Sequence, residues 1–297
     1  MRAETSHLLN ALEQRQLILV TGKGGTGKST LVAALATLAA RRCERVLVVE
    51  FNATPRLPAL IDGAAVRAIN IEADQVVGTV LQRLLRLPAI VSRVLNNRVV
   101  RIFANTSPAA REMIAMDELR DVVERSAAEN CPVIADLPAS GHALSFLDTP
   151  RAVRDLLRVG PIAQVALRAE QLLLDPARCE MVVVTLPEEL PVNETLELVE
   201  RARQLKLACL AVVVNQVPAS LLDPDDRPLL DALHAQDGPG VGRYDAPARQ
   251  HSEQLAQART QIERLRSAVK APIIELPRCA QPDARCCVDA LVQALSA

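Results

Sequence analysis

The chain has 297 residues, of which 49% are hydrophobic, so it is long enough to bury one large core. Aromatic residues make up only 1% of it and Trp is absent. The core must therefore be built from Leu, Val, Ile and Ala, as in a buried parallel sheet that helices cover. Lys and Arg number 34 against 35 Asp and Glu, without a block of like charge, which argues against a nucleic-acid-binding surface.

Short aliphatic runs alternate along the chain with segments of helical periodicity. In chain order we predict a strand at 16–20, a helix at 29–42, strands at 45–49 and 68–71, a helix at 75–94, a strand at 99–104, a helix at 108–128, a strand at 132–135, and a helix at 142–157 with a break near Pro150. Further on we predict a short helical segment around 158–180, a strand at 181–185, a helix at 191–205, a strand at 210–214, a loop-rich segment around 218–245 with one short helix, a helix at 246–269, a strand at 272–276 and a helix at 284–295. This alternation predicts an α/β fold, namely a single domain over 1–297 with a doubly wound, mostly parallel sheet and helices on both faces.

Membrane and metal-binding features are missing from the sequence. The longest apolar stretches, 31–40 and 207–214, are shorter than the ~20 residues that cross a bilayer. Residues 1–16 contain no hydrophobic signal core, so a cytoplasmic protein without stable membrane insertion is expected. The seven cysteines are scattered without a C-x-x-C pair, and the four histidines lack zinc-ligand spacing.

A glycine-rich segment, GKGGTGKST, lies between the first predicted strand and the first predicted helix. It completes the Walker A pattern G-x-x-x-x-G-K-S, in which the glycines let the backbone direct its N–H groups at phosphate oxygens. Lys28 is expected to reach the β- and γ-phosphates, and Ser29 to place its hydroxyl on Mg²⁺. The residues expected to hold Mg·ATP are Gly22, Gly24, Gly25, Thr26, Gly27, Lys28, Ser29 and Thr30.

Lys23 directly follows the first glycine, where an ordinary phosphate loop needs no lysine. The pattern resembles the deviant Walker A of the family that contains MinD, the nitrogenase iron protein and the arsenite-pump ATPase ArsA. The resemblance implies a P-loop NTPase of the signature-lysine class, in which Lys23 reaches the nucleotide of the facing subunit. It also implies a homodimer, or a heterodimer with a paralogous ATPase.

The segment CPVIADLPASGHALSFLDTPRAVRDLL, residues 131–157, resembles the switch II segment of ArsA and of the ATPase that targets tail-anchored proteins. The resemblance implies that Asp136 holds Mg²⁺ through water and that Gly141 offers a backbone N–H near the γ-phosphate. For His142 a structural role in the turn is preferred over direct chemistry.

A third segment, VVVTLPEELPVNETLELVERARQLKL at 182–207, resembles the family's strand, Pro-Glu loop and following helix. After it, VVVNQV places Asn215 at a strand end, and the resemblance implies that this amide recognises adenine. Glu188 and Glu194 are interpreted as a solvated charge at a helix start and a surface pair.

Switch I departs from the family pattern. In VLVVEFNATPRLPALID, Asn52 stands where the family carries an Asp that positions the attacking water. An amide can hold a water but cannot take its proton. Glu50, two residues earlier on the same face of an extended chain, is the candidate substitute. ATP binding is therefore predicted more firmly than hydrolysis.

Three functions remain open. The leading hypothesis is an ArsA-like ATPase that acts as a nucleotide-switched dimer on an unknown protein client. The second is a non-hydrolysing nucleotide-binding subunit that partners an active paralogue, which Asn52 favours. The third is a MinD- or ParA-like positioning ATPase, which would need a basic amphipathic C-terminal helix or a basic DNA-binding patch. The client cannot be carried over from ArsA relatives, because the 158–180 segment lacks Met and the chain corresponds to one half of the tandem pump.

Overall fold

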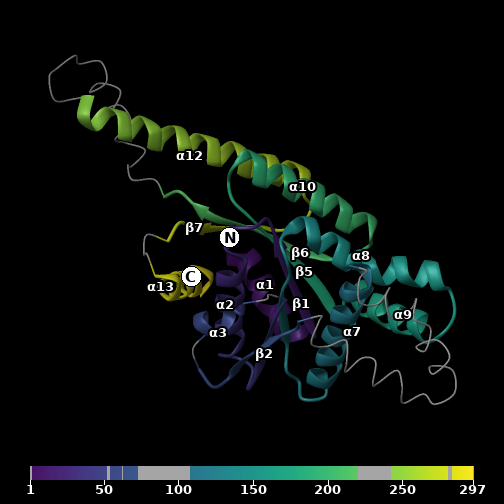
Figure 1. The fold of residues 1–297 in the computed structure, drawn as a ribbon. Coiled ribbons are helices and arrows are strands. Elements are labelled where there is room, and N and C mark those ends of the chain that lie inside the picture. Colours follow the sequence, from purple (N-terminus) through teal and green to yellow (C-terminus); the bar gives the residue numbers. More distant parts are fainter. Residues whose placement is uncertain are drawn as a thin grey trace.

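The strands form one parallel sheet in the computed structural model, which describes residues 2–51, 54–61, 63–72, 108–219, 242–279 and 283–296. The strands are β1 (Leu17–Gly22), β2 (Val46–Glu50), β3 (Val66–Asn70), β4 (Val133–Asp136), β5 (Cys179–Thr185), β6 (Cys209–Val217) and β7 (Ile273–Pro277). They lie in the order β3-β2-β4-β1-β5-β6-β7, and every pairing is parallel (Figure 1). The predicted α/β fold with a parallel sheet is confirmed.

Helices cover both faces of this sheet. They are α1 (Arg2–Gln14), α2 (Lys28–Ala39), α3 (Leu57–Leu60), α7 (Pro108–Ala127), α8 (Ser140–Leu157), α9 (Pro161–Leu174), α10 (Glu189–Gln204), α12 (Gly242–Ala268) and α13 (Ala284–Ser296). Side chains of β1 alternate between two buried clusters, because successive residues of a strand point to opposite faces. Leu17 and Leu19 join the cluster with α7, α8, α9, α10 and α12, whereas Ile18 and Val20 join the one with α1, α2, α3 and α13. None of the helices in the described ranges has the length and hydrophobicity to span a membrane.

Two features of the helices differ from the sequence-based expectation. The predicted break near Pro150 is wrong, since α8 continues through it to Leu157. Proline removes one backbone hydrogen bond, but tertiary contacts on the adjacent turn hold the helix. The Thr149 hydroxyl lies 2.6 Å from Glu112 Oε2 of α7 and 2.8 Å from the Ser145 carbonyl oxygen, and its one proton can be donated to either. The second difference is α1, for which no element was predicted.

Some predicted elements lie outside the described residues. These are the helix at 75–94, the strand at 99–104 and most of the loop-rich segment at 218–245. Within the predicted helical segment at 158–180, the structure has α9 at Pro161–Leu174.

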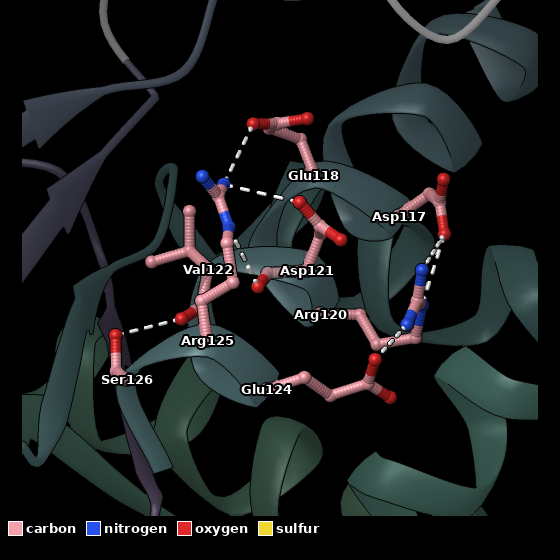
Figure 2. Close-up of polar contacts among 8 residues, drawn as sticks. All are labelled: Asp117, Glu118, Arg120, Asp121, Val122, Glu124, Arg125 and Ser126. Atoms are coloured by element: carbon pink, nitrogen blue, oxygen red, sulfur yellow. Dashed lines mark hydrogen bonds and ion pairs between the residues drawn. The ribbon is translucent and has the colours of Figure 1, made fainter. Parts of the chain in front are cut away.

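A polar network runs along α7 (Figure 2). The Arg120 guanidinium is buried and donates from Nε and Nη2 to Asp117 Oδ1, at 2.9 and 2.8 Å. It also donates to Glu124, whose side chain is about half exposed. The other contacts drawn in Figure 2 link Arg125 to Glu118 and Asp121, and Ser126 to Val122. All of these contacts lie within one helix, so they bear on its stability.

We expect Asp117→Ala to lower the free energy of unfolding by about 3 kcal/mol, because it leaves a buried guanidinium without two of its hydrogen bonds. Chemical denaturation of both proteins measures the difference. The matched control is Glu200→Ala, which removes the partner of Arg203 at the same i,i+3 spacing on the exposed face of α10. Solvent screens that pair, so its loss should hardly change stability. Equal effects of the two substitutions would contradict the burial argument.

Candidate functional site

The glycine-rich loop lies between the end of β1 and the start of α2, at the carboxyl edge of the sheet. Its backbone turns at Gly22, Gly25 and Gly27, which have φ angles of 147°, 86° and 90°. Close packing adds a second requirement at two of them. A Cβ at Gly22 would lie 2.0 Å from the Val184 carbonyl oxygen, and one at Gly27 would lie 2.4 Å from Asn215 Nδ2. Replacing Gly22 would therefore move the backbone, and replacing Gly27 would strain the loop and displace the Asn215 side chain.

Side chains within the loop fold onto its own backbone. Thr26 Oγ1 donates to the Lys23 carbonyl at 2.9 Å, and Lys28 Nζ donates to the same carbonyl at 3.1 Å. Burial lowers the pKa of Lys28 from its ordinary value. The negative charge of Asp136 raises this pKa, and the positive charge of Arg56 lowers it. Lys28 is thus a half-buried ammonium held over the loop, where an anionic ligand would stabilise its charge. Thr30 follows in the first turn of α2 and is half-buried.

The two residues predicted to hold Mg²⁺ are brought together. Ser29 Oγ donates to Asp136 Oδ2 at 2.5 Å, since β4 lies beside β1 in the sheet. Asp136 is only 4% exposed, and its Oδ1 has no hydrogen-bond partner among the described residues. Burial raises the pKa of Asp136, whereas the Ser29 hydrogen bond and the Lys28 charge oppose that rise. A buried carboxylate oxygen without a partner is costly, so this pair fits a bound cation or its water.

Glu50, at the end of β2, is the neighbour of Asp136 in the sheet register. It is fully buried, and its carboxylate accepts hydrogen bonds from the backbone N–H groups of Arg56, at 2.9 Å, and Leu57, at 3.3 Å. The Glu50 carboxylate therefore holds the chain that enters α3. Asn52, the predicted water-positioning residue, lies outside the described residues.

Lys23 forms an ion pair with Glu194 of α10, with Nζ 2.5 Å from Oε1. The two side chains are 37% and 40% exposed. The sequence favoured a solvated charge and a surface pair for Glu188 and Glu194, but it did not identify Lys23, 171 positions away, as the partner of Glu194. The contact follows from the pairing of β1 with β5, with Gly22 opposite Val184, because that pairing places the segment after β5 beside the loop after β1.

Asn215 of β6 is also brought to the loop. Its Nδ2 donates to the Thr26 carbonyl at 2.8 Å, and the residue is 6% exposed. Gly141 lies in the first turn of α8, two residues after Ala139. A Cβ at Gly24 would lie 3.9 Å from that of Ala139, so the start of α8 borders the loop. The predicted site residues in the described ranges thus share one edge of the sheet.

Comparison with known proteins adds independent information. Residues 17–225 match the family described as the CobQ/CobB/MinD/ParA nucleotide binding domain. The chain is 31% identical to the protein named ATPase BagA of Mycobacterium tuberculosis, over 88% of this chain and 87% of that protein. It is 23% identical to ATPase ASNA1 homolog 1 of Paramecium tetraurelia, over 74% of this chain and 80% of that one. It is 26% identical to the arsenical pump-driving ATPase of Escherichia coli, over 83% of this chain but only 41% of the pump protein.

Proposed function

Since the chain belongs to the CobQ/CobB/MinD/ParA nucleotide-binding domain family, we propose that it acts as an ArsA-like ATPase, a nucleotide-switched dimer that hydrolyses ATP slowly. The observation that carries the proposal is the contact between Ser29 and the buried Asp136 beneath the glycine-rich loop. Asp136 Oδ1, which has no hydrogen-bond partner among the described residues, is an oxygen that Mg²⁺ or its bound water could use. Loss of ATP binding in a Lys28 variant, argued in the Discussion, is the direct test.

Each site residue then has a distinct role. The loop N–H groups and Lys28 would bind the phosphates, and Gly141 would offer a further N–H near the terminal one. Ser29 and Asp136 would hold Mg²⁺, whose charge would neutralise part of the phosphate charge. Asn215 would recognise adenine with the part of its amide that does not bind the Thr26 carbonyl.

Slow hydrolysis follows from the residues at switch I. Asn52 can orient a water but cannot accept its proton. The buried Glu50 carboxylate already accepts two backbone hydrogen bonds, which supports a structural role for it. If the rate of hydrolysis is zero, the chain would act instead as a nucleotide-binding subunit that partners an active paralogue.

The dimer is proposed from the position of Lys23. Its ammonium is held by Glu194 of the same chain, on the exposed side of the loop. In the proposed switch, Lys23 leaves Glu194 and reaches the nucleotide of the facing subunit. Glu194 would then restrain the signature lysine until a partner chain binds.

We expect Glu194→Gln to strengthen ATP-dependent dimerisation about 2- to 5-fold, because a half-exposed ion pair is worth under about 1 kcal/mol. Lys23→Ala should abolish the dimer. Light scattering with a slowly hydrolysed ATP analogue measures both, on the chain alone and with any co-purifying paralogue.

The control is Glu197→Gln, an exposed residue one turn further along α10, which should change nothing. A strict monomer under every condition would refute the dimer. Weaker association of Glu194→Gln would instead show that Glu194 supports the interface.

A MinD-like membrane tether is less well supported. The apolar residues Val288, Leu291, Val292 and Leu295 of α13 are buried in the core cluster that contains α2. This apolar face is therefore already used for packing.

A further inference from the structure

Arg56 lies between β2 and α3, at the edge of the site, and none of the roles proposed above uses its side chain. Its backbone N–H donates to Glu50 Oε2 at 2.9 Å, which fixes its backbone beside the end of β2. Glu50 is in turn the sheet neighbour of Asp136. The side chain of Arg56 is exposed, and no ion pair of its guanidinium occurs within the described ranges.

The backbone of Arg56 brings a positive charge to the edge of the sheet that carries Lys28 and Asp136, since Glu50 holds that backbone and is paired with Asp136. Two cations, Lys28 and Arg56, thus belong to the edge that carries the Asp136 carboxylate, which Ser29 already binds. Like charges held near one another repel, and a polyanionic ligand would offset that repulsion.

The strand order shows which part of a nucleotide Arg56 would meet. The strand ends along the edge of the sheet carry, in sequence, Glu50 on β2, Asp136 on β4, the glycine-rich loop on β1, the segment after β5, and Asn215 on β6. Arg56 thus lies on the opposite side of the loop from Asn215, the proposed adenine contact. A nucleotide with its base at β6 and its phosphates over the loop would direct its terminal phosphate toward β4 and β2.

We propose that Arg56 binds the terminal phosphate of ATP from within the same chain, so that the site distinguishes ATP from ADP. The planar guanidinium can donate two parallel hydrogen bonds to phosphate oxygens. Because Glu50 holds the Arg56 backbone, this contact would also link the segment entering α3 to the presence of that phosphate. The inference rests on the proposed binding of ATP.

The test compares the affinities of Arg56→Gln and Arg56→Lys for ATP and ADP, measured by calorimetry with Mg²⁺. Arg56→Gln should weaken ATP binding about 10- to 100-fold, which corresponds to the loss of one or two charge-assisted hydrogen bonds. Its affinity for ADP should change much less. The ATP affinity of Arg56→Lys should lie between those of the wild type and Arg56→Gln, since lysine keeps the charge but cannot donate two parallel hydrogen bonds. Both variants keep the backbone contact to Glu50, so their unfolding temperatures without nucleotide should match the wild type.

The control is Arg67→Gln, an exposed arginine of β3 that pairs in register with Leu47, three residues before the end of β2. It should leave both affinities unchanged. Equal losses for ATP and ADP, or no loss in Arg56→Gln, would overturn the inference while leaving the ATPase proposal standing. If the wild type binds neither nucleotide, the proposed function fails first and this inference with it.

Discussion

Lys28→Ala is expected to weaken ATP binding by at least about 100-fold, to the point where calorimetry detects none. Lys28 Nζ lies over the glycine-rich loop, 3.1 Å from the Lys23 carbonyl, and its charge acts on Asp136. The substitution removes charge-assisted hydrogen bonds to two phosphate groups, each worth about 1.5–3 kcal/mol. It also takes away a cation that offsets the buried carboxylate of Asp136.

The control for this experiment is Lys270→Ala, which removes one exposed lysine after α12 and the same formal charge. Its affinity for Mg·ATP should equal that of the wild type. Asp136 keeps its hydrogen bond from Ser29 in the Lys28 variant, so the fold should persist, and thermal unfolding checks this. Undiminished affinity in folded Lys28→Ala would refute the assignment of the loop as the phosphate site.

Asn52→Asp should accelerate ATP turnover by about 10²–10⁴-fold, the usual contribution of general-base assistance. The water that attacks the terminal phosphate must be oriented in line with the leaving oxygen and gains positive character as it bonds. A carboxylate can orient it, stabilise that charge and accept its proton, whereas an amide can only orient it. Phosphate release by the purified chain, at saturating Mg·ATP, measures the gain.

Glu50→Gln separates the two candidate roles of Glu50. If the buried carboxylate is structural, its loss should lower the unfolding temperature, because it accepts hydrogen bonds from the backbone of Arg56 and Leu57. Turnover should then fall only to the extent that the variant is less stable than the wild type. A sharp loss of turnover in a variant as stable as the wild type would assign the catalytic role to Glu50. If the wild type already matches competent relatives and neither substitution changes the rate, the alignment of switch I is wrong.

The sequence by itself predicted the features that are formed by residues adjacent to one another in the chain. The glycine-rich loop is one, since the glycines, Lys28 and Ser29 all lie within one turn between a strand and a helix. The strands are another, because aliphatic runs identify buried parallel strands wherever these lie in the chain. The proximity of Asp136 to Ser29 also followed from the motif resemblance, and the contact at 2.5 Å agrees with it.

Only the tertiary structure decided which distant residues meet. Lys23 and Glu194 are brought together by the pairing of β1 with β5, and Arg56 lies at the same edge as Asp136 because β2 lies beside β4. The structure likewise showed that Glu50 holds the backbone before α3 and that α8 continues through Pro150. Hydrophobic periodicity records which face of an element is buried, but not the order of strands or their register. Those depend on how the whole chain packs, so the partners of single charged residues could not be read from their neighbours in sequence.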